Sequence, residues 1–277
     1  MNTNLDEGTI LPDRFTSEDI FSRILQVADE EVRKGARELF FSALAAGFAI
    51  TLTFLLLTNL YHASGGHEFL SALLYPLGFM YIILGNYQLF TENTLPPVAL
   101  ILERLASIPT MLTVWLIVLA GNILGGALGA FFLANTGVFS PEVAEVAVLI
   151  STKALEFPWW TLFFKGAFAG VIVAGVVWLD YAARDTVSRV IMIYVAFLAI
   201  PLADLFHVVV TATEIAYLGF MGQTAFWESL YQVGLPVLLG NTVGGVFFVT
   251  IVNYFQTPDY IREDPEKRLS WKRWLFS

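Results

Sequence analysis

The strongest constraint in this sequence is a series of long apolar stretches separated by short polar segments. A helix needs roughly 20 mostly apolar residues to cross the hydrocarbon of a bilayer. Only 14% of the 277 residues are charged, whereas soluble domains carry about 25%. The chain is therefore predicted to be an all-α polytopic membrane protein. Its apolar stretches lie at about 40–61, 69–88, 95–106, 110–134, 160–181, 188–220 and 230–255.

Two parts of this series are interrupted by residues that end helices. In the first, residues 88–94 are followed by a proline pair at 96–97, and in the second, Pro201 is followed by Asp204-Leu205-Phe206-His207. Proline ends a helix or begins a new one. A broken helix at membrane depth is tolerated only where its free backbone groups face protein or a water-filled cavity. Each break therefore marks a candidate permeation site.

The basic residues predict how the chain is oriented. If each interrupted part counts as one crossing, there are six crossings and both termini lie on the same side. That side holds 13 of the 15 Lys and Arg residues, all except Lys153 and Lys165. Because cytosolic segments are enriched in these residues, both termini are expected to be cytosolic. The expected parts are a cytosolic N-terminal segment over 1–38, a transmembrane channel domain over 39–256 and a cytosolic tail over 257–277.

Two segments outside the crossings carry their own patterns. Residues 17–39 are amphipathic, which is typical either of a helix lying on the membrane surface or of a helix docked on the protein. We favour docking on the cytosolic face of the protein. Residues 135–158 contain several charged side chains and a proline, and they are expected to form a long polar loop on the outer side.

A six-residue motif occurs twice in matched positions. Residues 121–126 read Gly-Asn-Ile-Leu-Gly-Gly, and residues 240–245 read Gly-Asn-Thr-Val-Gly-Gly. Each half of the chain then has one full helix, one broken helix and one helix with the motif. Since each half has three crossings, the two halves insert with opposite orientation. Such inverted repeats place solute sites near the middle of the membrane, where the broken helices meet.

The residues of this motif have a physical interpretation. Gly121 and Gly240 are expected to let helix backbones approach closely, as small residues do in lipid. Asn122 and Asn241 are expected to bind the free backbone groups of the neighbouring breaks. Ordinary small-residue packing is the alternative for either copy alone, and it is compatible with the architectural role.

In their order and spacing, these features resemble the formate/nitrite transporter family over residues 38–256. The markers are Leu89-Phe90-Thr91 in the first break, Val177-Trp178 at the end of the fourth helix, His207 in the second break, and the motif at 240–245. The resemblance implies an aquaporin-like fold, a homopentamer with one pore in each protomer, and a multi-pass location in the inner membrane.

The resemblance also implies functional residues. Thr91 and His207 would contact the substrate in the pore, and Lys153 would do so in the outer vestibule. Apolar constrictions would lie near Phe79 and Ile200 on the cytosolic side and near Leu89 and Phe90 on the periplasmic side. Phe206 is included with the constriction residues, and it stands where family members commonly have Glu. Gly170 stands where they commonly have an Asn near the central His.

The chemistry of His207 fits the transport of an anion. Moving a carboxylate-sized ion into a low-dielectric medium costs on the order of 20 kcal/mol in the idealised case. An anion avoids this cost by taking up a proton or by exchanging water for fixed donors. Imidazole, with an ordinary pKa of about 6.5, serves either route, and Thr91 would orient it or donate to the solute. A structural histidine joining two helix ends is the alternative.

The nearby charged residues leave several interpretations open. Lys153 is either an anion attractor at the outer mouth or a solvated loop residue. Lys165 is expected to extend outward to the membrane surface. Asp204 is either a partner of His207 or the N-cap of the outer half-helix beginning near residue 205, and we favour the cap.

The predicted function is a channel or transporter for a small monovalent anion such as formate or nitrite, linked to protons through His207. The alternatives are a pore for a neutral or weak-acid solute and a non-conducting membrane scaffold. No nucleophile–base pair, cofactor motif, metal-ligand cluster or cysteine is found in the sequence, so we expect neither an enzyme nor a cofactor or metal. The expected partners are the small solute, the lipid bilayer and copies of the same chain, with no nucleic acid.

Overall fold

The computed structural model of the chain describes residues 15–257 and 268–277. Four helices in these ranges are long and apolar enough to cross a membrane. They are α2 (Ala36–Ala63), α6 (Ile108–Asn135), α8 (Trp159–Ala182) and the continuous helix Phe226–Gln256. The last consists of α11 (Phe226–Ser229), the π-helical η4 (Leu230–Gly234), α12 (Leu235–Val243), the π-helical η5 (Gly244–Ile251) and α13 (Val252–Gln256).

Two further crossings are broken, as predicted. The first consists of α3 (Glu68–Ala72) and α4 (Pro76–Leu84) before the break, and of the 3-10 turn η2 (Glu92–Thr94) and α5 (Pro96–Leu102) after it. The second consists of α9 (Thr186–Leu202) and α10 (Val208–Phe220). Pro96 and Pro97 open α5, where a missing N–H is tolerated because the first turn of a helix leaves such donors free.

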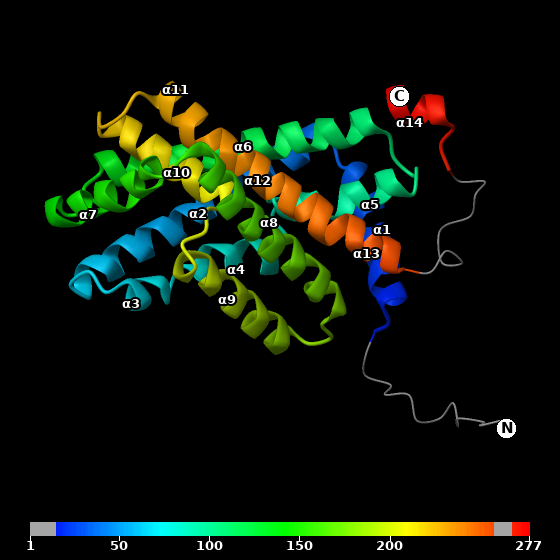
Figure 1. Cartoon of the computed structure of the whole chain (residues 1–277), viewed down its shortest axis with the longest axis horizontal. Coiled ribbons are helices and arrows are strands. Elements are labelled where there is room, and N and C mark those ends of the chain that lie inside the picture. The colour runs from blue at the N-terminus through cyan, green and yellow to red at the C-terminus, as the bar shows by residue number, and fades with distance from the viewer. Residues whose placement is uncertain (1–14, 258–267) are drawn as a thin grey trace.

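The two ends of the molecule carry different short elements. Figure 1 shows α3, α7 (Pro141–Thr152) and α11 at one end of the long axis. It shows α1 (Ser17–Val32), α13 and α14 (Trp271–Phe276) at the other. We call the end with α1 the inner end and the opposite one the outer end.

The amphipathic helix α1 is docked on the protein at the inner end. Thr16 and Asp19 form a capping box, in which the Asp19 N–H donates to Thr16 Oγ1 at 3.2 Å and the Thr16 N–H donates to the Asp19 carboxylate at 3.0 Å. The helix packs against α5 and α8 through Ile20, Phe21, Ile24, Leu25 and Ala28. The helix is therefore docked on the protein and ends at Val32, while its cytosolic side stays a prediction.

The segment 135–158, expected to be a loop, is mostly helical. It contains α7 and the 3-10 turn η3 (Lys153–Glu156). Ser140 caps α7 by accepting a hydrogen bond from the Val143 N–H at 3.4 Å, and Pro141 takes an early helical position. The sequence Ser-Pro-Glu at 140–142 therefore marks a helix start that the loop prediction missed.

The two halves of the chain use the same close helix contact. α6 packs on α2, and α12 packs on α8. A Cβ atom added to Gly121 would lie 2.9 Å from the carbonyl oxygen of Phe40, and one added to Gly240 would lie 2.1 Å from that of Phe163. Both motif glycines therefore lie where two helix backbones approach closely, and this approach leaves no room for a side chain at either position.

Gly170 belongs to the same kind of contact. A Cβ atom there would lie 2.2 Å from the carbonyl oxygen of Asn241, just as one on Gly47 would lie 2.1 Å from that of Asn122. The expectation that position 170 faces the space around His207 is therefore wrong. An Asn side chain does not fit at this position, because the α12 backbone fills the space in front of it.

Candidate permeation site

The first break is held by the side chain of Asn122 on α6. Its Oδ1 accepts a hydrogen bond from the Phe90 N–H at 2.8 Å. Its Nδ2 donates to the carbonyl oxygens of Gln88 at 2.9 Å and Ala43 at 2.8 Å. Because Ala43 lies on α2, one buried amide joins the break to two helices. The bonds to Phe90 and Gln88 satisfy backbone groups that a broken helix leaves free.

Asn241 on α12 makes the same three bonds in the second half. Its Oδ1 accepts from the Val208 N–H at 2.8 Å, and its Nδ2 donates to the carbonyl oxygens of Phe206 and Gly166 at 2.9 Å each. Gly166 lies on α8, the counterpart of α2. Both motif asparagines therefore lie where the repeat predicts them, each at the break of its own half.

The two breaks meet where Thr91 contacts His207. Thr91 Oγ1 lies 2.8 Å from His207 Nε2, and both residues are buried. The Phe79 ring is edge-on to the imidazole, with the centroids 4.9 Å apart, and it stacks on Phe197 at 3.9 Å. In the described part of the chain His207 Nδ1 has no hydrogen-bond partner. This buried nitrogen is thus available to bind a small solute.

A cavity of about 240 Å³ at the outer end, the outer vestibule, reaches His207. Lys153, Asp204 and Phe206 are among its lining residues. Lys153 Nζ lies 2.9 Å from Asp204 Oδ1. Partial burial disfavours the charged ammonium, but the hydrogen bond and charge of Asp204 outweigh this and raise the pKa of Lys153 above its ordinary value. Lys153 therefore stays charged at neutral pH.

The structure corrects two predictions about this loop. Asp204 does not cap the outer half-helix, since α10 begins at Val208 and the residue at its N-cap position is His207. Lys165 does not extend to the membrane surface but donates to Asp204 Oδ2 at 2.7 Å and to the Asp204 carbonyl oxygen at 2.8 Å. Both differences have one cause: a partly buried carboxylate needs cationic partners in place of water.

A second cavity, of about 250 Å³, lies at the inner end and is called the inner vestibule. It is lined by Glu31 of α1, by Gln88 and Glu92 beside Thr91, and by Asp180 of α8, among others. The Gln88 side-chain amide donates to Glu31 Oε1 at 2.9 Å, which joins α1 to the first break. Burial raises the pKa of the Glu31 carboxyl. The Thr91–His207 pair lies between the two vestibules.

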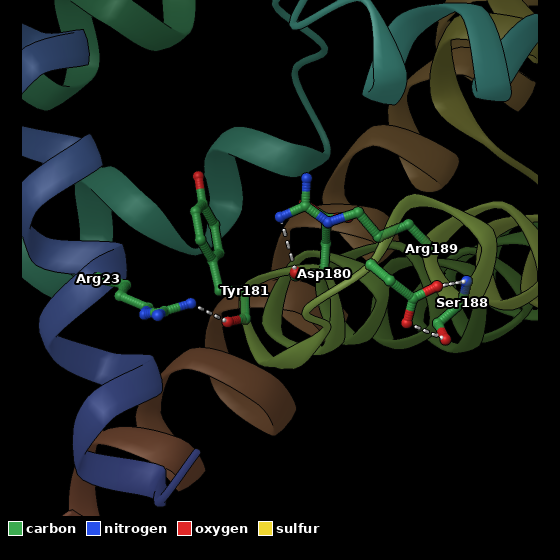
Figure 2. Close-up of polar contacts among 6 residues, drawn as sticks. Arg23, Asp180, Tyr181, Ser188 and Arg189 are labelled. Atoms are coloured by element: carbon green, nitrogen blue, oxygen red, sulfur yellow. Dashed lines mark hydrogen bonds and ion pairs between the residues drawn. The ribbon is translucent and has the colours of Figure 1, made fainter. Parts of the chain in front are cut away.

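The floor of the inner vestibule is held by contacts between α1, α8 and α9. Figure 2 shows the Arg189 guanidinium of α9 beside Asp180 of α8, where a terminal nitrogen donates to the Asp180 carbonyl oxygen at 3.3 Å. Arg189 Nε also lies 3.3 Å from Asp180 Oδ1. The figure also shows Arg23 of α1 donating to the carbonyl oxygen of Tyr181 at 3.4 Å. The inner ends of these helices are therefore joined through the last residues of α8.

Three of the apolar residues expected to narrow the pore, Phe79, Ile200 and Leu89, lie on the sides opposite to those predicted. Phe79 contacts Tyr75, and Ile200 precedes Pro201, and both Tyr75 and Pro201 line the outer vestibule. Leu89 follows Gln88, which lines the inner vestibule. The reason is the direction of the chain, since α4 runs inward from the outer end and reaches position 79 before position 89.

The aromatic residues among them make different contacts. The Phe90 ring packs edge-on against Trp115 of α6, with centroids 5.7 Å apart. Phe206 is partly buried in the wall of the outer vestibule, where its ring contacts that of Phe157 at 5.8 Å. Phe79, Leu89, Phe90 and Ile200 are buried. Packing thus accounts for Phe90, whereas Phe79 contacts the central imidazole directly.

Three features of the site were missed in the sequence. Phe197 lies ten positions before His207, and its place against Phe79 depends on the packing of α4 on α9. The pairing of Asp204 with two lysines and the contact between Glu31 and Gln88 join segments far apart in the chain. Charged residues within apolar stretches were the available signal, but it does not identify their partners.

Fold and site together define a multi-pass membrane channel or transporter built from two inverted repeats. Residues 18–255 match the family described as formate/nitrite transporter. The chain belongs to this family, whose members are channels and transporters rather than enzymes.

Individual relatives are distant. The chain is 29% identical over 243 residues to the inner membrane protein YfdC of Escherichia coli, covering 86% of this chain and 77% of the relative. It is 26% identical over 205 residues to a probable formate transporter of Methanothermobacter thermautotrophicus, covering 68% and 74%.

Two solved structures share the fold. An FNT family ion channel superposes with a TM-score of 0.77 at 22% identity, covering 87% of this chain and 99% of that one. A pentameric formate channel with formate bound superposes with a TM-score of 0.66 at 21% identity, covering 80% and 97%. The aquaporin-like fold predicted from the sequence is confirmed.

Proposed function

We propose that the chain conducts a small monovalent anion such as formate or nitrite and that His207 links this transport to protons. The observation that carries the proposal is the Thr91–His207 contact, buried between two vestibules, with Nδ1 of the imidazole unpartnered among the described residues. An anion cannot cross the apolar contact of Phe79 and Phe197 with its charge unshielded. The imidazole and the Thr91 hydroxyl supply the proton or the hydrogen bonds that replace water.

Each of the other predicted residues has a part in this proposal. Lys153 attracts the anion into the outer vestibule. Phe79 and Ile200 narrow the path on the outer side of His207, and Leu89 narrows it on the inner side. Phe206 forms part of the vestibule wall. Asn122 and Asn241 hold the two breaks in register.

A second candidate is favoured by the charges in both vestibules. The outer one is lined by Glu68, Glu156, Asp204 and Glu214, and the inner one by Glu30, Glu31, Glu92 and Asp180. The lining lysines are only Lys153 and Lys34 in these two sets of described residues. A carboxylate-rich mouth repels free anions, so a weak acid would then enter in its neutral form.

Flux into proteoliposomes tests both candidates. Formate, nitrite, hydrosulfide, acetate and a neutral solute are compared over a pH series while a trapped dye reports internal pH. The proposal predicts that His207→Ala lowers flux at least about tenfold, and that Thr91→Val lowers it less, by about three- to tenfold for one lost hydrogen bond. Thr91→Ser, which retains the hydroxyl, is the matched control.

The outcomes separate the candidates. A rate that saturates with the anion at fixed pH and loses its pH response in His207→Ala supports the first candidate. A rate that follows the neutral acid and keeps this pH response in His207→Ala supports the second. Unchanged flux and unchanged pH response in His207→Ala would show that the central role of His207 is wrong. A protein that passes none of the solutes, including the neutral one, is better described as a non-conducting scaffold.

We further propose a homopentamer with both termini cytosolic. The pentameric relative supports the assembly, and the excess of basic residues at the inner end supports the orientation. The described parts of the predicted terminal segments, residues 15–38 and 268–277, lie at this end. Residues 1–14 and 258–267 lie outside the described residues. Because the chain lacks Cys, a single cysteine at Ser64 or Ser270 tests the orientation, since an impermeant maleimide should label only Ser64→Cys in intact cells.

A further inference from the structure

Asp204 holds two lysines at the mouth of the pore. Lys153 lies 2.9 Å from its Oδ1 and Lys165 lies 2.7 Å from its Oδ2. The side chains of Lys153, Asp204 and Lys165 are 47%, 33% and 22% exposed. The three groups carry a combined charge of +1, and Lys153 is the member most open to the vestibule.

The backbone fixes the position of this carboxylate. Asp204 has φ of 53°, a left-handed conformation that Asp and Asn adopt more readily than other side-chain-bearing residues. The loop continues into Phe206, whose carbonyl accepts from Asn241, and then into His207. Asp204 therefore stands beside the route to His207 on a loop that is tied to α12.

We propose that Asp204 is a tethered competitor of the substrate. Its carboxylate pairs with the Lys153 ammonium until a permeating monovalent anion displaces it. This inference rests on the proposed function, because it takes Lys153 as the first anion contact. An exposed ion pair contributes little net free energy, so the Lys153–Asp204 pair opens readily. An incoming anion must nevertheless bind Lys153 more strongly than a carboxylate that is already in place.

Lys165 completes the arrangement. When an anion takes Lys153, Asp204 keeps its contacts with Lys165 through Oδ2 and the backbone carbonyl oxygen. The carboxylate is thus never left unpaired in front of His207, where it would repel the anion. The phenyl rings of Phe157 and Phe206 flank the Lys165 ammonium, with centroids 4.7 and 6.0 Å away, and they help to hold it there. One monovalent anion then neutralises the triad.

The competitor role and a simple positioning role for Asp204 predict opposite changes in the half-saturating concentration of the solute when Asp204 is mutated. Asp204→Asn retains the left-handed backbone, and Lys165 retains the carbonyl oxygen of residue 204. If Asp204 competes with the substrate, its removal lowers the half-saturating concentration of formate or nitrite by about two- to fivefold, the range expected from an exposed ion pair. If Asp204 merely positions Lys153, the half-saturating concentration rises.

Proteoliposome flux over a concentration series decides between them. Lys165→Met should raise the half-saturating concentration, because Asp204 then pairs with Lys153 alone. The gain in Asp204→Asn should disappear in the Lys153→Met background, and it should shrink at high salt because the charges are exposed. Should Asp204→Asn fail to assemble, Asp204→Gly also tolerates the positive φ and removes the carboxylate.

The flux measurements distinguish a failure of the proposed function from a failure of the competitor role of Asp204. A wild-type protein that passes no small solute overturns the proposed function. If the wild-type protein conducts but the Asp204 variants have an unchanged or raised half-saturating concentration, only the competitor role of Asp204 is overturned. An equal gain with and without Lys153 also overturns it, because Asp204 would then act through the general charge of the vestibule.

Discussion

The two helix breaks share a backbone clamp but differ in their side chains. In each break an Asn of the Gly-Asn motif accepts one backbone N–H and donates to two carbonyl oxygens, one in the break and one on the neighbouring full helix. The first break presents the hydroxyl of Thr91, and the second presents the imidazole of His207. The repeat thus specifies where the backbone opens, and the two halves supply different chemistry at the opening.

The breaks also differ in the contacts made by the residues that face the vestibules. The first is buried, and Gln88 at its start is bound by Glu31 of α1. The second is partly exposed, and Asp204 is bound by two lysines. Each break is therefore joined to a charged group from outside its own crossing, at the inner end in one case and at the outer end in the other. The two breaks therefore have the same backbone geometry at the centre of the molecule, but the vestibules that they face carry different charged groups.

The largest expected effect comes from removing either clamp. Asn122→Ala and Asn241→Ala each leave one N–H and one carbonyl oxygen of a break without a partner, and an unsatisfied buried group costs about 1–3 kcal/mol. We expect each variant to lose roughly 3 kcal/mol or more of stability, measured by thermal unfolding in detergent. Asn253→Ala is the control, because within the described residues that side chain bonds only to Val249 and Gln256 of its own continuous helix.

If the clamps are equivalent, the two variants lose similar stability. A large loss in one and a small loss in the other would break the comparison. It would mean that one break is held mainly by its other contacts, through Glu31 in the first half or through Lys165 in the second.

The clamps were predictable from the sequence because a repeated motif at matched distances has one simple structural explanation. The six crossings and the positions of both breaks also followed from hydrophobic length and proline. The sides of the constriction were wrong because the chain direction through the first break was not followed. The partners of Asp204 were missed because Lys153, on η3, comes close to it only once α7 has formed, and nothing in the spacing of the two residues records this.

An intermediate effect is expected at the glycines beside the clamps. Gly170→Ala on α8 forces a Cβ to within 2.2 Å of the Asn241 carbonyl oxygen, and Gly47→Ala on α2 does the same to within 2.1 Å of that of Asn122. Overpacking of this kind costs about 1–3 kcal/mol. Gly175→Ala on α8 is the matched control, since a Cβ there meets no atom of the described residues within 4 Å.

Thermal unfolding of these three variants sharpens the comparison. Gly175→Ala should leave stability unchanged or raise it slightly, because Ala has the higher helix propensity. Equal losses in Gly47→Ala and Gly170→Ala would extend the equivalence of the halves from the hydrogen bonds to the helix packing. A Gly170→Ala protein as stable as the wild type would contradict the close approach of α12 to α8.

The smallest effect is expected where α1 meets the first break, and it depends on pH. Burial raises the pKa of Glu31 above its unfolded value, against the opposing effects of the Gln88 hydrogen bond and of Lys34. The folded state therefore binds this proton more tightly than the unfolded state does. The contribution of Glu31 to α1 docking is full below its ordinary pKa and declines as pH rises through the raised value.

Hydrogen exchange of the α1 amides over a pH series, corrected for the intrinsic exchange rate, should show protection falling as pH rises. Glu31→Gln keeps an acceptor for the Gln88 amide but has no proton to lose, so its α1 should show a flatter response. A wild-type response as flat as that of Glu31→Gln would mean that docking of α1 does not depend on the protonation of Glu31. The hydrogen bond to Gln88 and packing would then join α1 to the first break without a contribution from charge.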